Sequence, residues 1–177
     1  MKHATPQQKA DLIRFELIYQ HGGIWLDAST IVYENLDWIE KLVAQHQTNS
    51  FAYYRKKNTT CPDFPVLENW LLASSAKNMF FKSWFEELFK AIELTPKVYI
   101  QQIKENNENY QDYFQEIGRL EYLVAYVACQ KIMRTTLPSM TLINCDRNAF
   151  FYQVKNKWMK EKVLIDLALN YPPVEKP

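Results

Sequence analysis

The chain has 177 residues and a formal net charge of +1, and this length suits one domain spanning residues 1–177. Hydrophobic residues make up 47% and aromatic residues 15%, which excludes an intrinsically disordered chain. The near-neutral charge argues against a nucleic-acid partner, because nucleic-acid-binding domains carry a basic patch or a high pI. The surplus of rings has two interpretations: a core built from large side chains, or a cleft that stacks carbohydrate or bases.

Cysteine spacing and apolar runs indicate the compartment. The three cysteines lie far apart and form no Cys-x-x-Cys or Cys/His pattern, which argues against a disulfide framework and a zinc site. Reduced thiols are the ordinary state in the cytosol. Met1–Lys9 is polar and lacks the apolar segment of a signal peptide, and no apolar run reaches the ~20 residues of a membrane span. We therefore expect a cytoplasmic protein.

The first two elements are marked by local signals. Thr5-Pro6-Gln7-Gln8 supplies an N-cap threonine, a proline at the first helical position and the glutamine of a capping box. The helix should run to about His21 and end at Gly22, since glycine commonly follows the last helical residue. Ile24–Leu26 has the composition of a short buried strand, and Ile31–Tyr33 that of a second one.

The remaining chain alternates short strands with longer helices, and helices dominate its last two-thirds. The predicted strands are Phe51–Arg55, Asn69–Ala73 and Thr141–Cys145. The predicted helices are Asp37–Ala44, Asn78–Ile92, Pro96–Asn107, Asp112–Arg134 and Asn156–Leu169, with a loop over Lys56–Pro65. Short strands interleaved with helices indicate the α/β class.

Asp11 and Arg14 fall in one sector of the first helix when its residues are placed at intervals of about 100°. Glu16 and Gln20 fall roughly opposite, and apolar side chains fill most of the remaining surface. A helix this apolar is mostly buried, so its two polar sectors cannot both be ordinary solvent-facing surface. Either Asp11 and Arg14 form a simple i,i+3 ion pair, or one polar sector lines a cleft.

A carboxylate follows the first strand. The chain turns on Gly22 and Gly23, and the strand then delivers Asp27 at its C-terminal end. Ligands of open α/β sheets bind at the carboxyl ends of strands, and a carboxylate there can hold a hard divalent cation that bridges diphosphate oxygens. The alternative is that Asp27 serves as a turn or cap residue.

Together these residues resemble a known family. The D-x-x-R…Y-x-x-G-G-x-Y-x-D signature of DXD-containing sugar-binding glycosyltransferases is similar to Asp11-x-x-Arg14…Tyr19-x-x-Gly22-Gly23-Ile24-Trp25-Leu26-Asp27. The chain resembles the capsular polysaccharide synthesis branch of this family in two stretches, Leu26-Asp27-Ala28-Ser29-Thr30 and Trp70-Leu71-Leu72-Ala73-Ser74. The resemblance implies a GT-A-like nucleotide-sugar-binding core. It also implies a hexosyltransferase-type reaction, in which a sugar passes from a nucleotide-sugar donor to a capsular-type polysaccharide or lipid-linked glycan acceptor.

The resemblance further implies roles for individual residues. Asp11 and Arg14 would contact the sugar and phosphates of the donor, and Tyr19 and Gly23 would belong to the same donor site. Arg14 and a divalent cation would neutralise the leaving diphosphate, which is a preorganised electrostatic role. Asp27 would be both a donor-binding and a catalytic residue.

The implied cation, Mn²⁺ or Mg²⁺, would be held by Asp27 and Ser29. Ser29 stands where the family has the second carboxylate of its D-x-D, and a hydroxyl is a weaker ligand for these metals. Either Asp27 and the diphosphate hold most of the metal, or another acid joins from later in the chain, or the site is weak. If the strand continues past Asp27, its period of two residues puts Ser29 on the same face.

The family also has α/β structure ahead of this helix, whereas ten residues precede Asp11. We therefore expect the chain to lack the usual N-terminal strands and to leave Ile24–Leu26 near an open edge. Such an edge favours a homodimer or a partner fragment. The alternative to an enzyme is a non-catalytic fragment or degenerate relative that binds nucleotide-sugar or a partner chain without turnover.

Three further features have two interpretations each. Glu121, within the predicted helix Asp112–Arg134, is either a general base or the ion-pair partner of Arg119. Asp146 follows a predicted strand and is either a late metal or acceptor ligand or a cap. The basic stretch Lys155–Lys162 is either solvated surface or a peripheral contact with the inner face of the membrane.

Overall fold

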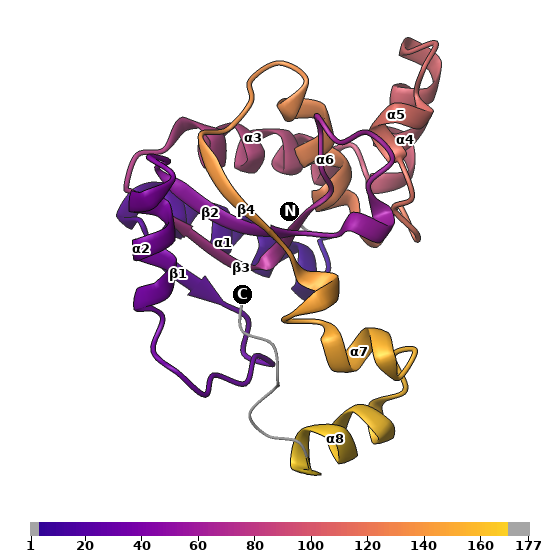
Figure 1. The fold of residues 1–177 in the computed structure, drawn as a ribbon. Coiled ribbons are helices and arrows are strands. Elements are labelled where there is room, and N and C mark those ends of the chain that lie inside the picture. Colours follow the sequence, from indigo (N-terminus) through magenta and orange to yellow (C-terminus); the bar gives the residue numbers. More distant parts are fainter. Residues whose placement is uncertain (1–3, 170–177) are drawn as a thin grey trace.

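The computed structural model of the chain describes residues 4–169, which form a four-stranded mixed sheet with helices on both faces (Figure 1). The strands are β1 (Gly23–Leu26), β2 (Ser50–Tyr54), β3 (Leu67–Ser74) and β4 (Met140–Asn144). The helices are α1 (Pro6–His21), α2 (Asp37–Gln45), α3 (Met79–Glu93), α4 (Pro96–Asn106), α5 (Gln111–Phe114), α6 (Val124–Met133), α7 (Phe151–Lys155) and α8 (Lys160–Leu169), with 3-10 turns η1 (Lys56–Asn58) and η2 (Cys145–Arg147). The predicted α/β class is confirmed.

The order of the strands brings distant parts of the chain to one edge of the sheet. The order is β1-β3-β2-β4, in which β3 pairs antiparallel with β1 and β2, and β4 pairs parallel with β2. β1, β2 and β4 therefore run in one direction and β3 runs in the other. As a result, the C-terminal ends of three strands meet the beginning of the fourth.

The beginning of β3 is irregular. Ala52 of β2 pairs with Leu72, while Tyr54 pairs with Leu67, so one residue of β2 lies opposite the four residues Glu68–Leu71. A bulge of this kind bends the strand and turns its side chains in new directions. The bulge places two polar residues of an otherwise apolar strand at the edge where the other three strands end.

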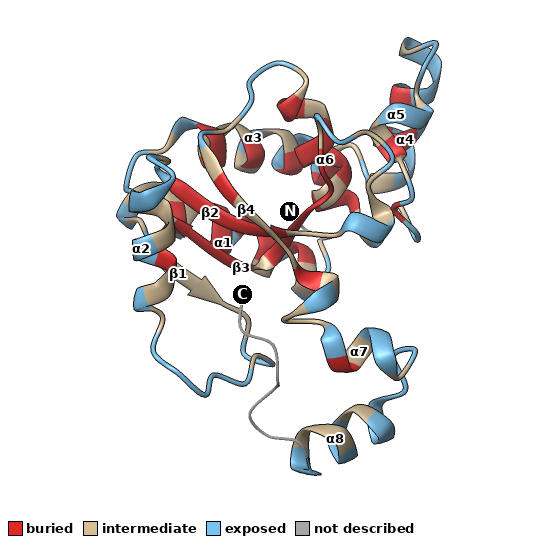
Figure 2. Ribbon diagram, viewed as in Figure 1, coloured by how far each residue is buried: buried red, intermediate tan, exposed pale blue. Residues whose placement is uncertain are grey.

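Strand residues alternate between two cores, one on each face of the sheet. Figure 2 shows that β2, β3 and α6 are largely buried. On one face, Leu72 packs with α1, α3 and α6, and the Phe15 and Trp84 rings stack with their centroids 4.2 Å apart. On the other face, Phe51 packs with Ile39 of α2. The layered packing fixes α1 against the sheet, and α1 carries three of the predicted site residues, Asp11, Arg14 and Tyr19.

The predicted start and end of α1 are both confirmed. The Gln8 backbone N–H donates to Thr5 Oγ1 at 3.2 Å, and the Thr5 N–H donates to Gln8 Oε1 at 2.9 Å, which completes the capping box. At the other end, the Gly22 N–H donates to the Ile18 carbonyl at 2.9 Å. Gly22 has a φ of +67°, a conformation that favours glycine.

Three predicted elements are wrong. Ile31–Tyr33 is an exposed connection and not a strand. The predicted helix over residues 112–134 is interrupted between α5 and α6, where Gln115 and Arg119 have positive φ angles of 44° and 39°. The predicted last helix, Asn156–Leu169, begins only at Lys160 as α8, because Lys157 and Trp158 have positive φ angles of 50° and 62°. A right-handed helix cannot continue through such residues.

The predicted open edge at Ile24–Leu26 is present, because β1 pairs only with β3 within the described residues. Two apolar residues of the neighbouring helix α1, Ile13 and Leu17, are also exposed. None of the helices within residues 4–169 combines the length and the apolar character needed to cross a membrane.

The Gly22 backbone offers a sharp test of this packing. A Cβ at Gly22 would lie 2.6 Å from the backbone nitrogen of Ala76, in addition to the strain of a positive φ. We predict that Gly22→Ala lowers the free energy of unfolding by about 3 kcal/mol, measured by urea denaturation. Gly23→Ala should cost only about 1 kcal/mol, since its φ is positive but its surroundings are open. Gly118→Ala, with neither constraint, is the neutral control, and equal losses in all three variants would contradict the proposed close contact.

Candidate functional site

A cleft of about 330 Å³ lies at the edge where the strands meet. Asp27 follows β1, Arg55 follows β2, and Glu68, Asn69 and Trp70 come from the β3 bulge. Aromatic residues from other segments complete much of the wall, namely Tyr122, Tyr126, Phe150 and Trp158. The cleft therefore joins charged groups at strand ends to a set of large rings.

Arg14 is the centre of the first polar network. Its guanidinium is buried and donates from Nη1 to Asp11 Oδ1 at 2.9 Å and from Nη2 to Asp27 Oδ1 at 2.6 Å. Trp25 Nε1 also donates to Asp27 Oδ1, at 2.9 Å, and Asn69 Nδ2 donates to Asp11 Oδ1 at 3.0 Å. The predicted convergence of Asp11, Arg14 and Asp27 is thus observed, and it ties α1 to β1 and β3.

The members of this network differ in their access to the cleft. Asp27 lines it with a side chain that is 32% exposed, whereas Asp11 and Arg14 lie buried behind it. Arg14 and Trp25 both bond to Oδ1 of Asp27. Oδ2 of Asp27 is therefore the oxygen best placed to contact a ligand.

Arg14 forms ion pairs with two carboxylates, those of Asp11 and Asp27. Burial raises the pKa of Asp11 to about 6, although the Arg14 guanidinium opposes this shift. The neighbouring Asp27 carboxylate raises the pKa further. The site thus holds more negative charge than Arg14 alone neutralises.

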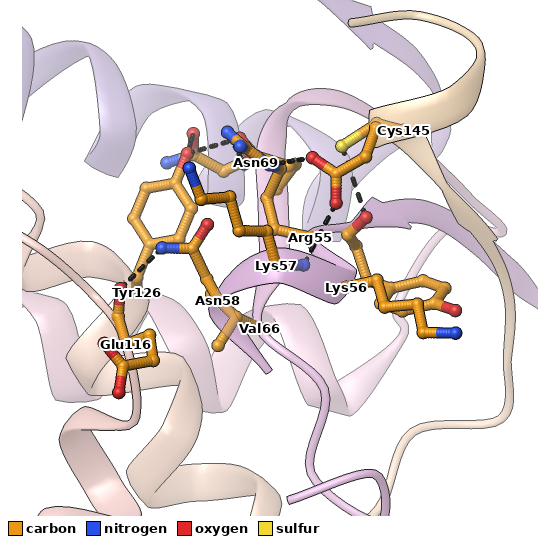
Figure 3. Close-up of polar contacts among 12 residues, drawn as sticks. Arg55, Lys56, Lys57, Asn58, Val66, Asn69, Glu116, Tyr126 and Cys145 are labelled. Atoms are coloured by element: carbon orange, nitrogen blue, oxygen red, sulfur yellow. Dashed lines mark hydrogen bonds and ion pairs between the residues drawn. The ribbon is translucent and has the colours of Figure 1, made fainter. Parts of the chain in front are cut away.

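A second network lies on the other side of the cleft (Figure 3). Arg55 donates from Nε to Asp146 Oδ1 at 2.6 Å, and its Nη1 lies 3.9 Å from Glu68 Oε1. The Tyr126 hydroxyl donates to Glu68 Oε2 at 2.7 Å. Burial raises the pKa of Glu68, although the Tyr126 hydrogen bond and Arg55 act in the opposite direction.

The two networks meet at the β3 bulge. The Tyr126 hydroxyl lies 3.4 Å from Asn69 Oδ1, and Asn69 in turn bonds to Asp11. Arg55 is held further by two rings, since its guanidinium carbon lies 5.3 Å from the ring centroids of both Phe150 and Trp158. Four carboxyl groups and two guanidinium groups converge around one cleft, which favours cations and ligands that carry them.

The predicted cation site at Asp27 and Ser29 stays a prediction. Within the part of the chain that the structure describes, no group of three or more His, Cys, Asp or Glu side chains could hold a metal ion. The strand ends at Leu26, and the Thr30 N–H donates to the Asp27 carbonyl at 2.9 Å, so the chain turns there. The strand therefore does not continue past Asp27, which was the condition for Ser29 to lie on the same strand face, and Ser29 is exposed in the turn.

Two predicted donor-site residues lie away from the cleft. Tyr19 follows Arg14 by five residues, which corresponds to roughly 140° around α1, and its ring packs near Lys77 and Lys82. Gly23 is the first residue of β1, and Asp27 follows the last one. An extended chain therefore separates the two residues by about 13 Å. Neither residue lines the cleft. The adjacent pair Gly22 and Gly23 instead allows the sharp turn from helix to strand.

Glu121 also differs from its prediction. It lies in a turn before α6 rather than within a helix, and it is exposed and does not line the cleft. Sequence reasoning missed the buried carboxyl group that does line it, Glu68. A signal was present: Glu68 and Asn69 are adjacent polar residues inside the apolar run from Val66 to Ala73. Polar residues in a buried strand require partners, and such partners collect at functional sites.

Comparison with known proteins places the chain in a family. Residues 2–164 match the family described as capsular polysaccharide synthesis protein, and the chain belongs to this family. The match covers the whole of both polar networks. It confirms the capsular polysaccharide synthesis branch that the sequence motifs indicate.

Two curated relatives carry glycosyltransferase names. The chain is 27% identical over 86 residues to glycosyltransferase afumC of Aspergillus fumigatus, which is 49% of this chain and 22% of that protein. It is 30% identical over 91 residues to O-glycosyltransferase braB of Annulohypoxylon truncatum, which is 49% of this chain and 20% of that protein. The matched region thus spans about a fifth of each relative. No solved structure matches the chain significantly.

The raised pKa of Asp11 leads to a testable pH dependence. Because the folded state keeps the proton up to about pH 6 and the unfolded state releases it near pH 4, this group destabilises the fold as pH rises between them. We predict that Asp11→Asn is more stable relative to wild type at pH 7 than at pH 4, by up to about 3 kcal/mol. Urea denaturation at both pH values measures this difference. Asp63→Asn, at an exposed loop position, should show no such change, and a pH-independent difference for Asp11→Asn would contradict the assignment.

Proposed function

We propose that this chain carries the nucleotide-sugar site of a GT-A-like glycosyltransferase that extends a polysaccharide or lipid-linked glycan. The observation that carries the proposal is the convergence of Asp11, Arg14 and Asp27 at the cleft edge. These are the residues that the glycosyltransferase motif singles out. Membership of the capsular polysaccharide synthesis family and the names of the two relatives support the same reaction class.

Asp27 is the donor-facing residue in this proposal. Its Oδ1 is held by Arg14 and Trp25, so Oδ2 meets a ribose hydroxyl or a divalent cation carried on the diphosphate. A bound cation supplies charge that stabilises the leaving diphosphate. Arg14 acts through Asp27, because the guanidinium is buried behind that carboxylate and fixes its orientation.

The opposite wall suits the acceptor. Glu68 carries a carboxyl group with a raised pKa beside the open cleft, and Tyr126 holds one of its oxygens. A carboxylate of this kind can accept a proton from an attacking sugar hydroxyl. Trp70 and Trp158 line the same cleft and add apolar surface to this wall.

A second candidate function is binding of the nucleotide-sugar without turnover. The observation that favours it is the exposed Ser29 at the position where the family has a second metal-binding carboxylate. Donor hydrolysis distinguishes the two functions. An enzyme releases free sugar in the presence of Mn²⁺ and loses this activity in EDTA, whereas a binding protein releases none under either condition.

We predict that nucleoside diphosphate binding depends on Asp27 and on Mn²⁺. Calorimetric titration with UDP, GDP and ADP should show binding to the wild type only with Mn²⁺ present, and Asp27→Asn should weaken it by roughly a hundredfold, since a charged ligand to the cation is lost. Asp27→Asn should still fold, because Arg14 keeps Asp11 as its partner. Ser29→Ala should change affinity by less than about threefold, since water can replace a neutral ligand.

The matched control is Asp63→Asn, which removes an exposed carboxylate from a loop that does not line the cleft. Ser29→Asp recreates the missing carboxylate and should tighten Mn²⁺ binding. Equal affinities for wild type and Asp27→Asn would show that Asp27 has only a structural role. Absence of binding to every nucleotide, with and without Mn²⁺, would overturn the proposed function.

A further inference from the structure

The hydroxyl of Tyr126 lies within reach of two acceptors beside the cleft. It donates to Glu68 Oε2 at 2.7 Å, and Asn69 Oδ1 lies 3.4 Å away (Figure 3). Burial raises the pKa of Tyr126 well above its usual range, and the Glu68 carboxylate adds to this shift. The hydroxyl therefore keeps its proton and remains a donor at every ordinary working pH.

Asn69 is fixed as the second acceptor by its own bond to α1. Its amide nitrogen donates to Asp11 Oδ1 at 3.0 Å, and this bond turns the amide oxygen toward Tyr126. The Tyr126 hydroxyl can thus donate to Glu68 when that group is a carboxylate, or to the amide when Glu68 is protonated and accepts more weakly. In both protonation states the donor has a partner, which avoids the cost of an unpaired buried group.

The two oxygens of Glu68 have different surroundings. Oε2 accepts from Tyr126, whereas Oε1 lies 3.9 Å from Arg55 Nη1, which is too far for a hydrogen bond. Glu68 lines the cleft with a side chain that is 9% exposed. Oε1 is therefore the oxygen that remains available to a proton arriving from the cleft.

The charged and titratable groups that face Glu68 come from three segments. Arg55 follows β2, Cys145 and Asp146 belong to η2, and Tyr126 belongs to α6. Burial is the main cause of the raised pKa of Glu68, and Asp146 adds to it. The Tyr126 hydrogen bond and the Arg55 charge lower this pKa, and the hydrogen bond has the larger effect. Tyr126 is thus the neighbour that most favours the carboxylate over the acid.

We propose that Tyr126 is a positioning residue for proton transfer: its hydroxyl holds Oε2 of Glu68 and leaves Oε1 to take the proton of the attacking hydroxyl. This inference rests on the proposed function, with Glu68 as the proton acceptor. The oxygen of the attacking hydroxyl forms a bond to the anomeric carbon of the donor. The bond from that carbon to the diphosphate breaks, and its electron pair leaves with the diphosphate. The proton passes to Glu68 Oε1, and the Tyr126 hydroxyl turns to Asn69 Oδ1.

Donor hydrolysis reports this step, because water then takes the place of the acceptor hydroxyl. The rate is measured from about pH 5 to about pH 9 with UDP-glucose, GDP-mannose and ADP-glucose in the presence of Mn²⁺. Tyr126→Phe keeps the ring and removes the hydrogen bond, so the pKa of Glu68 rises. The acidic limb of the kcat profile should therefore move up by roughly one pH unit, with a loss of about tenfold at the acidic end and little change at the alkaline end.

Two further variants separate this role from a structural one. Glu68→Gln removes the proton acceptor and should lower kcat by roughly a hundredfold or more. Adding Tyr126→Phe to Glu68→Gln should cause no further loss, since Tyr126 acts through Glu68. Tyr99→Phe is the matched control, because it removes a hydrogen bond of the same kind, from Tyr99 to Glu87 Oε1 at 2.9 Å, away from the cleft. Its pH profile should match that of the wild type.

The titration of Glu68 is also read directly, because Asp11, with a pKa of about 6, titrates in the same acidic limb. Carbon NMR of protein labelled at its glutamate carboxyl groups identifies Glu68 by the signal that Glu68→Gln removes. The pKa of Glu68 should rise by roughly one unit in Tyr126→Phe and stay unchanged in Tyr99→Phe.

An equal fall in kcat at every pH, or an unchanged pKa of Glu68 in Tyr126→Phe, would overturn the inference and leave Tyr126 with a structural role. Nucleotide binding by the wild type without any hydrolysis would overturn it as well, while the donor site at Asp27 would stand. Absence of nucleotide binding would instead overturn the proposed function, and the inference with it.

Discussion

A buried guanidinium between two carboxylates holds the site together. The buried guanidinium of Arg14 carries a positive charge that requires anionic partners, and Asp11 and Asp27 provide them from α1 and from the end of β1. The helix itself is fixed by Phe15, which stacks on Trp84 in the core. Packing of α1 therefore sets where Arg14 lies, and Arg14 sets where the Asp27 carboxylate points. A ligand at Asp27 meets a carboxylate that is already oriented, which is the condition for preorganised binding.

The second constraint is the direction of β3. Because this strand alone runs against the other three, its first residues lie beside their C-terminal ends. The bulge at Glu68–Leu71 then frees Glu68 and Asn69 from the regular alternation of side chains. In a regular strand, adjacent residues point to opposite faces of the sheet. The irregularity allows Glu68 to reach Arg55 and Tyr126, while Asn69 reaches Asp11.

The sequence predicts the parts of the site that depend on local structure. Thr5 and Gly22 mark the ends of α1 by their own chemistry, and the spacing of Asp11 and Arg14 places both on one side of that helix. Asp27 follows within a short strand, so few conformations of the intervening chain are available. This is why their convergence could be expected from the sequence. Family resemblance then supplied the proposed roles, which the geometry by itself does not provide.

The remaining site residues depend on pairings between distant segments. Glu68 faces Arg55 only because β3 bulges against β2, and Asp146 reaches Arg55 only because β4 pairs parallel with β2. Neither register can be read from one segment alone. The sequence also does not predict that the helical structure is interrupted after α5 and after α7. Gln115 and Trp158 have positive φ angles there, and glycine is the residue that usually occupies such positions.

Charge in the cleft links the two networks functionally. Arg14 and Arg55 each lie beside two carboxyl groups. The net charge of each network is therefore negative when all four carboxyl groups are ionised. Such a field opposes the approach of a bare diphosphate and favours a cation. The cation and the nucleotide should therefore assist each other, because each reduces the charge that the other meets, and this coupling is reciprocal by thermodynamic linkage. Burial is the main cause of the raised pKa of Asp11, and the neighbouring Asp27 carboxylate adds to it, so a cation beside Asp27 would lower the pKa of Asp11 as well.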